Sequence, residues 1–311
     1  MPLTVHFFRM GMSNKEVALR FMGIYEAQFR GIELAGARVK FSLEMPETGA
    51  DVVVCTADAG DIGRVAEVMG GTGGKGAMVI YVPPVDQWFD AGLLRSVANR
   101  VAFVYGPVVS EVTEAAYAGV GIRYRYLPFG ADPELMRPLG LVPEYDVVFL
   151  GGLRHRRGYQ PFVEPLVKGL DPKRVLLMGS GWEKYGIASQ PVAYGARVNE
   201  LYNLGRVCIN FHAPEQCRGK AVQLDLNNRV FDLAMAGCVQ VCDNPEGVAM
   251  HFEAGEIFAE GTAESWVGRV MACLRMRDEE LKPMRQAARA RALAEHTWMH
   301  RGRMFLSWIN G

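Results

Sequence analysis

The feature that most constrains the fold is an alternation between short apolar runs and longer amphipathic segments. Most of the apolar runs are continuous, which is typical of parallel strands buried on both faces. The predicted strands of the first half are LTVHFF (3–8), RVKFSL (38–43), DVVVCT (51–56), AMVIYV (77–82), RVAFVY (100–105) and RYRYLP (123–128). The predicted helices between them are 13–35, 59–70, 90–98 and 110–118. Such strand–helix repetition predicts a doubly wound parallel sheet.

The alternation pauses once, which predicts two α/β domains. Segment 127–145 contains four prolines and has no helical or strand periodicity, so it is interpreted as a linker. Strands then follow at 145–151, 173–179, 205–211 and 238–244, with helices at 158–169, 196–203, 229–236, 262–276 and 279–294. We predict an N-terminal Rossmann-like domain (1–135), a C-terminal Rossmann-like domain (136–296), and a last helix (297–311) that packs back toward the N-terminal domain.

Composition excludes several classes of protein. The 34 basic and 34 acidic side chains give a net charge of zero, which argues against a protein that binds polyanions through its overall charge. No apolar run approaches the roughly 18 residues of a transmembrane helix, and the N-terminus lacks a signal-peptide layout. The six cysteines form no C-x-x-C pair. We therefore expect a cytoplasmic protein with reduced thiols and no transmembrane segment.

A glycine-rich stretch, GGTGGKG (70–76), has the letters of a phosphate-binding motif without its context. Gly71, Gly73 and Gly76 match G-x-G-x-x-G, but that motif must follow a strand and open a helix. Here a predicted helix precedes the glycines and a strand follows them. Lys75 is followed by glycine rather than by serine or threonine, which excludes a P-loop. We interpret the stretch as a surface loop.

Cysteines and histidines form two sets with some resemblance to metal sites. Cys208 and His212 share one face of a predicted strand, with Cys217 nearby, but a buried cysteine in a strand is usually a small apolar residue. His296 and His300 have the i, i+4 spacing of a zinc pair, without the H-E-x-x-H glutamate. We therefore predict no metal site, and assign the histidine pair to helix capping and packing.

The first motif that indicates chemistry is YDVVFLGGLRHRRGYQ (145–160). A strand ends at Gly151 and Gly152, where the absence of side chains lets a ligand approach the backbone. Arg154 and Arg157 follow, just before a predicted helix start. Helix N-termini favour anions, and arginine binds phosphate through two parallel hydrogen bonds. The motif predicts a phosphate or diphosphate site, with a solvated basic turn as the alternative.

The second motif is LDLNNRVFDLAMAGCVQVCDN (224–244). Asn227 or Asn228 can cap a short helix, which Gly237 can end. Arg229 and Asp232, three residues apart, share a face at its first turn. An arginine on a diphosphate and a carboxylate on two ribose hydroxyls would together bind a nucleotide. A simple Arg–Asp pair on the helix surface is the alternative.

Four ordered signatures resemble the CgeB-like glycosyltransferases, a family within the GT-B class. They are the strand and Arg-rich turn at 147–158, YGARVNELYNLGRVCINFH (194–212), LNNRVFDLAMAGCVQV (226–241) and EHTWMHR (295–301). Segment 127–138 is similar to the interdomain segment of many GT-B enzymes. The resemblance covers most of 101–311 and implies two Rossmann-like domains that face each other across a cleft.

The resemblance also implies roles for individual residues. Arg154, Arg157 and Arg229 would stabilise the diphosphate of a nucleotide-sugar donor, and Asp232, usually glutamate in the family, would contact the ribose. Asn228 and the backbone amides of Gly247 and Val248 would complete the donor site. The arginines would replace the metal ion of other transferases, since the chain has no Asp-x-Asp site. The nucleotide sugar is thus a co-substrate, and no cofactor is expected.

The acceptor and its activation stay open at this stage. In an inverting enzyme Asp86, which follows a predicted strand, is our candidate for the acceptor base, with His6 and Asp58 as alternatives. The acceptor could be a protein, a glycan, a small molecule or a modified DNA base, although net neutrality does not favour nucleic acid. A sugar-nucleotide epimerase or phosphorylase and a non-catalytic nucleotide- or sugar-binding protein are the rival functions. The oligomeric state is undetermined.

Overall fold

The computed structural model describes residues 2–9, 15–44, 50–57, 59–71, 77–82, 89–108, 111–152, 160–187, 193, 195–212, 215–217, 220–222 and 226–311. The chain divides into two compact units. The first comprises residues 1–129, 214–225 and 298–311, and the second comprises 130–213 and 226–297. The first unit is therefore assembled from separate stretches of the chain, including both of its ends.

The first unit contains a six-stranded parallel sheet of order β2-β1-β3-β4-β5-β6. Its strands are β1 (Thr4–Phe8), β2 (Arg38–Ser42), β3 (Val52–Thr56), β4 (Ala77–Tyr81), β5 (Val101–Gly106) and β6 (Tyr124–Tyr126). The middle strands are almost fully apolar and buried because helices cover both faces of the sheet.

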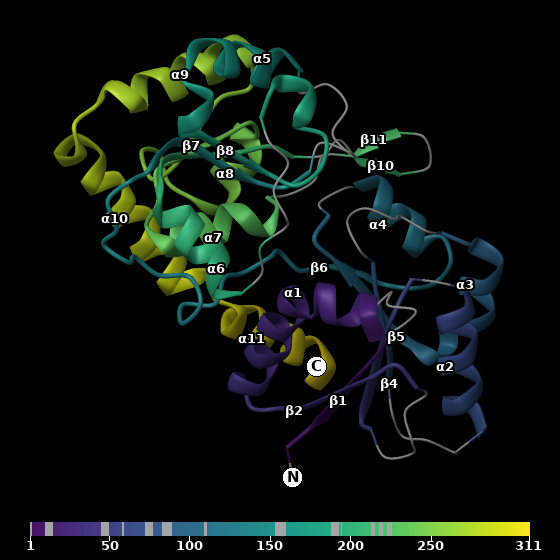
Figure 1. Cartoon of the computed structure of the whole chain (residues 1–311). Coiled ribbons are helices and arrows are strands. Elements are labelled where there is room, and N and C mark those ends of the chain that lie inside the picture. The colour runs from purple at the N-terminus through teal and green to yellow at the C-terminus, as the bar shows by residue number, and fades with distance from the viewer. Residues whose placement is uncertain are drawn as a thin grey trace. The chain divides into compact units, whose positions relative to one another are not determined.

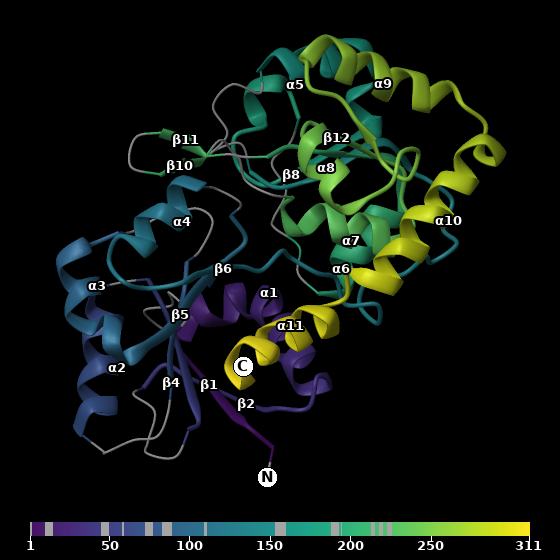
Figure 2. The same cartoon turned by 180° about the vertical axis from the view of Figure 1, so that it is seen from behind.

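Helices cover the two faces of this sheet as separate layers (Figures 1 and 2). One layer consists of α2 (Ala59–Gly71), α3 (Ala91–Val97) and α4 (Glu111–Ala118), which bury residues such as Ile62, Leu94 and Tyr117. The other consists of α1 (Lys15–Leu34) and α11 (Trp298–Asn310), which bury Phe29 and Phe305. The last helix of the sequence thus completes the core of the first unit.

Helices α1 and α11 cross at two glycines, Gly31 and Gly302. A Cβ atom on Gly302 would lie 2.4 Å from the carbonyl oxygen of Gly31, and one on Gly31 would lie 2.2 Å from that of Trp298. These distances are far below van der Waals contact, so the two backbones approach as closely as they do because neither position carries a side chain.

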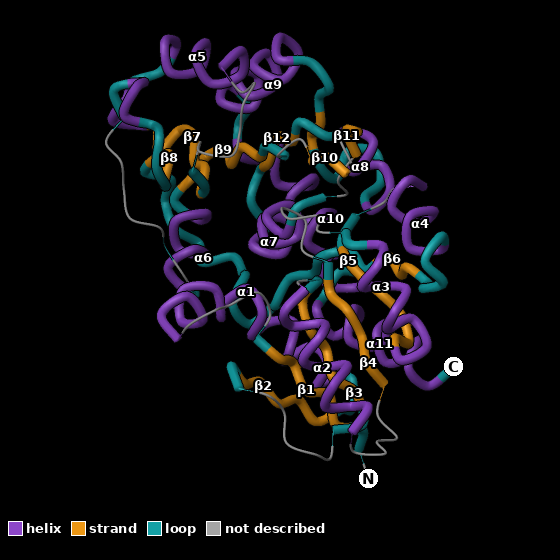
Figure 3. The backbone as a smooth tube through the Cα atoms, turned by 90° about the vertical axis from the view of Figure 1, so that its right-hand side faces the viewer, coloured by secondary structure: helices purple, strands orange, loops and turns teal. Residues whose placement is uncertain are grey.

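The second unit contains a five-stranded parallel sheet of order β13-β12-β9-β7-β8. Its strands are β7 (Tyr145–Leu150), β8 (Val175–Met178), β9 (Gly205–Asn210), β12 (Gln240–Cys242) and β13 (Phe258–Ala259). Its helices are α5 (Gln160–Gly169), α6 (Ala196–Asn203), α7 (Asn228–Ala236), α8 (Pro245–His251), α9 (Ala263–Arg275) and α10 (Asp278–Glu295). Figure 3 shows α5 and α9 on one side of these strands and α6 and α7 on the other.

The segment that the sequence analysis interpreted as a linker contacts helix α6 within the second unit. Asn199 of α6 accepts a hydrogen bond from the amide of Arg137 (3.0 Å) and donates one to its carbonyl (3.0 Å). Asn203, one turn later, accepts from the amide of Leu139 (2.8 Å). Two asparagine side chains therefore pair with the linker backbone in place of a neighbouring strand.

The predicted class, α/β with two doubly wound parallel sheets, is confirmed. Strand β13, helix α8, and the antiparallel hairpin of β10 (Glu215–Cys217) and β11 (Lys220–Val222) were not predicted. They have two to seven residues each, too few for hydrophobic periodicity to be read from sequence.

Candidate functional site at the carboxyl ends of the second sheet

The candidate site lies at the carboxyl edge of the second sheet, where polar side chains follow neighbouring strands. Strand β9 lies between β7 and β12, and all three are parallel. Gly151 follows β7, Asn210 ends β9, and Asp243 follows β12. Ligands of open parallel sheets bind outside this edge, so these residues share the position at which a ligand is expected.

Arg229, in the first turn of α7, is fixed at this edge by two strands. Its Nε donates to the carbonyl oxygen of Leu150 (3.0 Å) and its Nη1 donates to Oδ1 of Asn210 (2.7 Å). The guanidinium also stacks over the ring of Phe149, with 4.8 Å from Cζ to the ring centroid. Among the described residues, Nη2 has no hydrogen-bond acceptor. The side chain is half-buried and positively charged, and its Nε and Nη1 are held in place by β7 and β9.

The two glycines after β7 allow strands β7 and β8 to end in close contact. A Cβ on Gly179, which has φ +108°, would lie 2.5 Å from the amide nitrogen of Gly152. A Cβ on Gly151 would lie 3.1 Å from Nη2 of Arg229. The amide of Gly151 donates to Met178 (2.9 Å) and its carbonyl accepts from the indole of Trp182 (2.9 Å). A side chain at position 151 would therefore crowd the guanidinium, which the sequence pattern alone did not indicate.

Asn227 occupies the N-cap position of α7 but does not cap the helix with its side chain. Its Nδ2 instead donates to Oδ1 of Asn210 (3.1 Å) and to the carbonyl of Phe211 (3.1 Å), and its Oδ1 accepts from Nδ2 of Asn210 (3.2 Å). Asn210 is completely buried. Its Oδ1 therefore accepts from both Asn227 and Arg229, and ties the start of α7 to the end of β9.

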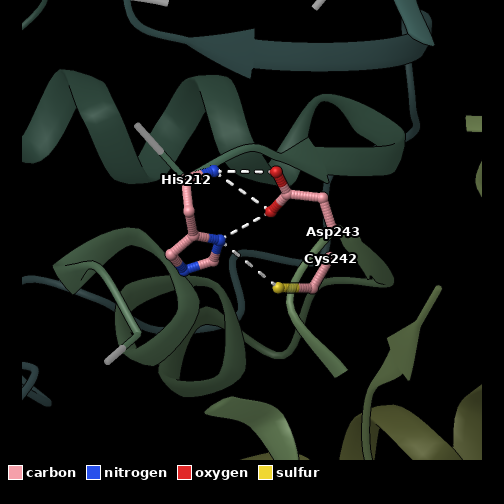
Figure 4. Close-up of side chains that lie close together, drawn as sticks. All are labelled: His212, Cys242 and Asp243. Atoms are coloured by element: carbon pink, nitrogen blue, oxygen red, sulfur yellow. Dashed lines mark hydrogen bonds and ion pairs between the residues drawn. The ribbon is translucent and has the colours of Figure 1, made fainter. Parts of the chain in front are cut away.

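His212 and Asp243 form a second buried pair beside this network (Figure 4). Nδ1 of His212 lies 2.6 Å from Oδ1 of Asp243 and 3.9 Å from the sulfur of Cys242, and Nε2 accepts from the amide of Asn227 (3.2 Å). Burial raises the pKa of the Cys242 thiol far above its usual range. The three side chains lie within 4.8 Å of one another, a spacing that a metal ion could bridge. Both ring nitrogens of His212 have hydrogen-bond partners in the protein, so the geometry fits a histidine that is held in place by hydrogen bonds better than a metal ligand.

Asp232 lies one turn after Arg229 on the same helix. Its Oδ2 accepts from Nδ2 of Asn228 (3.2 Å). Burial raises the pKa of the Asp232 carboxyl to about 7, although Arg229 and Asn228 both act to lower it. The carboxyl therefore exchanges its proton near neutrality, and either form can hydrogen-bond a sugar hydroxyl.

The raised pKa of Asp232 makes stability depend on pH. Between about pH 4 and 7 the folded protein holds a proton that the unfolded chain has lost, so the free energy of unfolding falls as the pH rises through this window. We expect Asp232→Asn to remove this dependence, which is at most about 1.4 kcal/mol per pH unit. Urea denaturation between pH 4.5 and 8 measures it, with Glu279→Gln, an exposed carboxylate, as control. Parallel pH profiles for Asp232→Asn and wild type would contradict the assignment.

Other residues predicted for the donor site have structural partners. The amide of Gly247 donates to the side chain of Asn244 (2.9 Å) and that of Val248 donates to the Asn244 carbonyl (3.0 Å). Asn244 is the N-cap of α8, so both amides are used within this helix and neither is free for a ligand. Trp182, after strand β8, is fully buried against Phe149.

Cys208 and His296, two of the residues considered as metal ligands, have hydrogen-bond partners in the protein. Cys208 and Cys238 are buried, and both thiols donate to the carbonyl of Tyr202 (3.5 Å each). His296 caps the end of α10, and its Nε2 donates to the carbonyl of His251 (2.8 Å).

Some predicted site residues lie outside the part of the chain that the structure describes. These are Arg154, Arg157, Asp86 and Asp58. His6, the remaining alternative for the acceptor base, lies inside strand β1 rather than at its carboxyl end. Its Nε2 lies 2.7 Å from the hydroxyl of Ser42, and burial together with Lys40 lowers its pKa.

A cavity of about 550 Å³ lies at the opposite edge of the second sheet, near the starts of β9 and β12. Its lining includes Arg206 and Arg289. Arg206 donates to the carbonyls of Leu274 and Met276 at the end of helix α9, and Arg289 donates to that of Met235 in α7. These arginines complete helix C-termini, and the cavity is separate from the candidate site.

The residues that sequence reasoning missed are Asn210 and the His212–Asp243 pair. Each is a polar residue directly after an apolar strand, at INFH (209–212) and VCDN (241–244). The sequence therefore contained these polar residues at strand ends. They can be assigned to one site only when β9 and β12 are known to be neighbouring strands.

Comparison with known proteins places these observations in a family context. The family model described as "Glycosyl transferase-like" matches residues 154–307, about half of the chain. No curated protein sequence matches significantly. No helix among the described residues is long and apolar enough to cross a membrane.

Solved structures are similar over nearly the whole chain. Sucrose-phosphate synthase from Thermosynechococcus elongatus is 10% identical, with TM-score 0.65 and coverage of 99% of this chain and 98% of that chain. Anabaena HepE in complex with UDP-glucose is 13% identical, with TM-score 0.63 and 99% of both chains covered. T4 phage β-glucosyltransferase in complex with UDP-glucose is 15% identical, with TM-score 0.61, covering 99% of this chain and 100% of that one. Residues 154–307 thus match a glycosyltransferase-like family model, and the two sheets have the GT-B fold of the similar structures.

Proposed function

We propose that the protein transfers a sugar from a nucleoside-diphosphate sugar and binds this donor at the carboxyl edge of the second sheet. The observation that carries the proposal is the guanidinium of Arg229, held by Leu150 and Asn210 beside the side-chain-free turn at Gly151. A fixed cation at this edge suits a diphosphate. Two of the similar structures contain UDP-glucose, which supports the same class of donor here.

In this proposal the donor contacts are divided among three parts of the second unit. Arg229 binds the diphosphate, and Arg154 and Arg157, which follow β7 in the sequence, add charge. Asp232, oriented by Asn228, accepts hydrogen bonds from the ribose hydroxyls. Negative charge develops on the leaving diphosphate as the sugar departs, and preorganised arginines stabilise that charge more than they stabilise the bound donor.

The proposed reaction needs no metal ion, because arginines neutralise the leaving group. The acceptor is bound by the first unit, and in an inverting reaction Asp86 takes the proton of its hydroxyl. The four sequence signatures support a CgeB-like enzyme within the broader family.

A thermal-shift panel tests donor binding directly. UDP-, GDP- and dTDP-sugars are compared with a CMP-sugar, which carries a single phosphate. A matching diphosphate donor at 100 times its Kd is expected to stabilise the fold by about 2.7 kcal/mol, with or without EDTA. Equal, negligible shifts for all donors would contradict donor binding, and loss of the shift in EDTA would contradict the metal-free proposal.

Product analysis separates the rival functions. A transferase releases a nucleoside diphosphate from the donor that the panel selects. Without its acceptor it does so slowly, by transferring the sugar to water. An epimerase changes the sugar without releasing the nucleotide. A binding protein shows the thermal shift with no change in the donor.

A further inference from the structure

Behind Arg229 lies a continuous chain of hydrogen bonds that ends at the carboxylate of Asp243. From Arg229 it passes through Asn210 and Asn227 to His212, and from His212 to Asp243. The chain connects the ends of β9 and β12 with the first turn of α7. All of its links lie within the second unit, and none of the residues behind Arg229 belongs to the predicted donor contacts.

The direction of each bond fixes the proton on the imidazole. Nε2 of His212 receives a hydrogen bond from the amide of Asn227, so it is unprotonated and acts as an acceptor. The proton therefore lies on Nδ1, which donates to Oδ1 of Asp243 over an Nδ1–Oδ1 distance of 2.6 Å. The carboxylate, which also accepts from the backbone amide of His212 (3.0 Å), holds the ring in this orientation and tautomer.

The position of the His212 ring affects the position of Arg229 through Asn227. Asn227 begins α7, and its side chain is paired with Asn210 instead of capping the helix. The backbone amide of Asn227 is thus bonded to the imidazole of His212, and the side chain of Asn227 is bonded to Asn210 of β9. Arg229 lies two residues later, with its Nη1 on the same Asn210 oxygen. A shift of Asn227 would move the helix start and the guanidinium together.

We infer that His212, oriented by Asp243, is a positioning residue for the phosphate-binding Arg229, and that its Nε2 acceptor is the atom that matters. The inference rests on the proposed function, since it assigns Arg229 to the diphosphate. His212 itself touches no substrate. Its effect is to keep the guanidinium where the diphosphate binds, because misplacement of a binding group by about 1 Å can cost as much as 100-fold in rate.

Two substitutions distinguish the roles of the two ring nitrogens of His212. In His212→Gln the amide oxygen can take the place of Nε2, whereas in His212→Asn the amide nitrogen replaces Nδ1 and the acceptor is lost. Calorimetry compares the binding of UDP with that of uridine, which lacks the phosphates. If the thermal-shift panel favours a guanosine donor, GDP and guanosine are used instead of UDP and uridine. His212→Asn is expected to weaken diphosphate binding about tenfold, with nucleoside binding unchanged. His212→Gln and the control Cys242→Ala, beside the same ring, are expected to bind like wild type.

Equal weakening of UDP and uridine in His212→Asn, or wild-type binding of both, would overturn the inference. If that variant does not fold, His212→Gln still tests the inference, because a selective loss of UDP affinity in that variant would overturn the role of the Nε2 acceptor.

Arginine side-chain NMR separates this inference from the proposed function. The Nε–H of Arg229, bonded to Leu150, is expected to give a slowly exchanging signal that Arg229→Lys identifies. His212→Asn should accelerate its exchange at least tenfold and His212→Gln should not. If wild type binds no nucleoside diphosphate but the signal follows this pattern, the proposed function fails and the positioning role stands. An unchanged signal in His212→Asn removes the positioning role.

Discussion

Arg229→Met is expected to weaken binding of the nucleoside-diphosphate donor by about ten- to a hundredfold, with little effect on binding of the free nucleoside. The substitution keeps the apolar stem over Phe149 but removes the charge-assisted bonds, which contribute about 1.5–3 kcal/mol. It also leaves Oδ1 of Asn210 with one donor fewer, although Asn227 still donates to it. Calorimetric titration with the diphosphate and with its nucleoside measures both affinities.

Two controls make the Arg229 result specific. Arg229→Lys keeps the charge but loses the planar fork, so it is expected to recover only part of the affinity. Arg174→Met removes an exposed arginine paired with Asp146 near the start of β8, away from the carboxyl edge, and is expected to bind like wild type. Diphosphate binding by folded Arg229→Met at wild-type strength would exclude Arg229 from the donor site.

The second large effect is expected in the first unit, where Gly302→Ala should lower the free energy of unfolding by about 3 kcal/mol. The added methyl group would lie 2.4 Å from the carbonyl oxygen of Gly31, and backbone atoms cannot move aside as the end of a flexible side chain can. Helices α1 and α11 must separate, which disturbs the aromatic contacts of Phe305 with Phe103 and Tyr105. Urea denaturation followed by tryptophan fluorescence measures the loss.

Gly63→Ala is the matched control for this substitution. Gly63 lies inside α2 of the same unit, and a Cβ there meets nothing within 4 Å. Alanine should therefore stabilise that helix by about 0.5–1 kcal/mol. Equal stability of the Gly302→Ala variant and wild type would show that the helices do not cross at the glycines.

Periodicity predicted most elements of both sheets well. The helix predicted at 196–203 is α6, and that predicted at 229–236 is α7 with one residue more. The strand predicted at 51–56 lacks only its first residue in β3. These elements are several residues long and are bounded by glycine, proline or capping residues, so local signals decide them.

Without the family resemblance, residue spacing predicted the candidate site only where its parts are close in sequence. Arg229 and Asp232 were placed together because they share one helix. Asn210 contacts Arg229 across 19 positions and His212 contacts Asp243 across 31, and neither distance has a local signal. These contacts depend on the order of strands in the sheet, which periodicity does not determine.

The start of α8 was not recognised from the sequence. Asn244 followed by Pro245 is a readable helix start, because asparagine is a favoured N-cap and proline suits the first position of a helix. Recognition of that signal would have shown that the amide of Gly247 belongs to the cap. Because this short helix was overlooked, the sequence analysis did not anticipate that Asn244 accepts from the amides of Gly247, three residues later, and Val248, four residues later.

The division of the first unit among separate stretches of the chain has a consequence for biosynthesis. Its sheet is complete by Tyr126, yet helix α11, which covers one face together with α1, begins at Trp298. During translation the apolar face that receives Phe305 has no native cover while roughly 170 residues are added, which takes about 10–30 s at bacterial or eukaryotic rates. A nascent chain of this topology is exposed to aggregation and to chaperones for that interval, because the core that is begun first is closed by a helix that follows the second unit in the sequence.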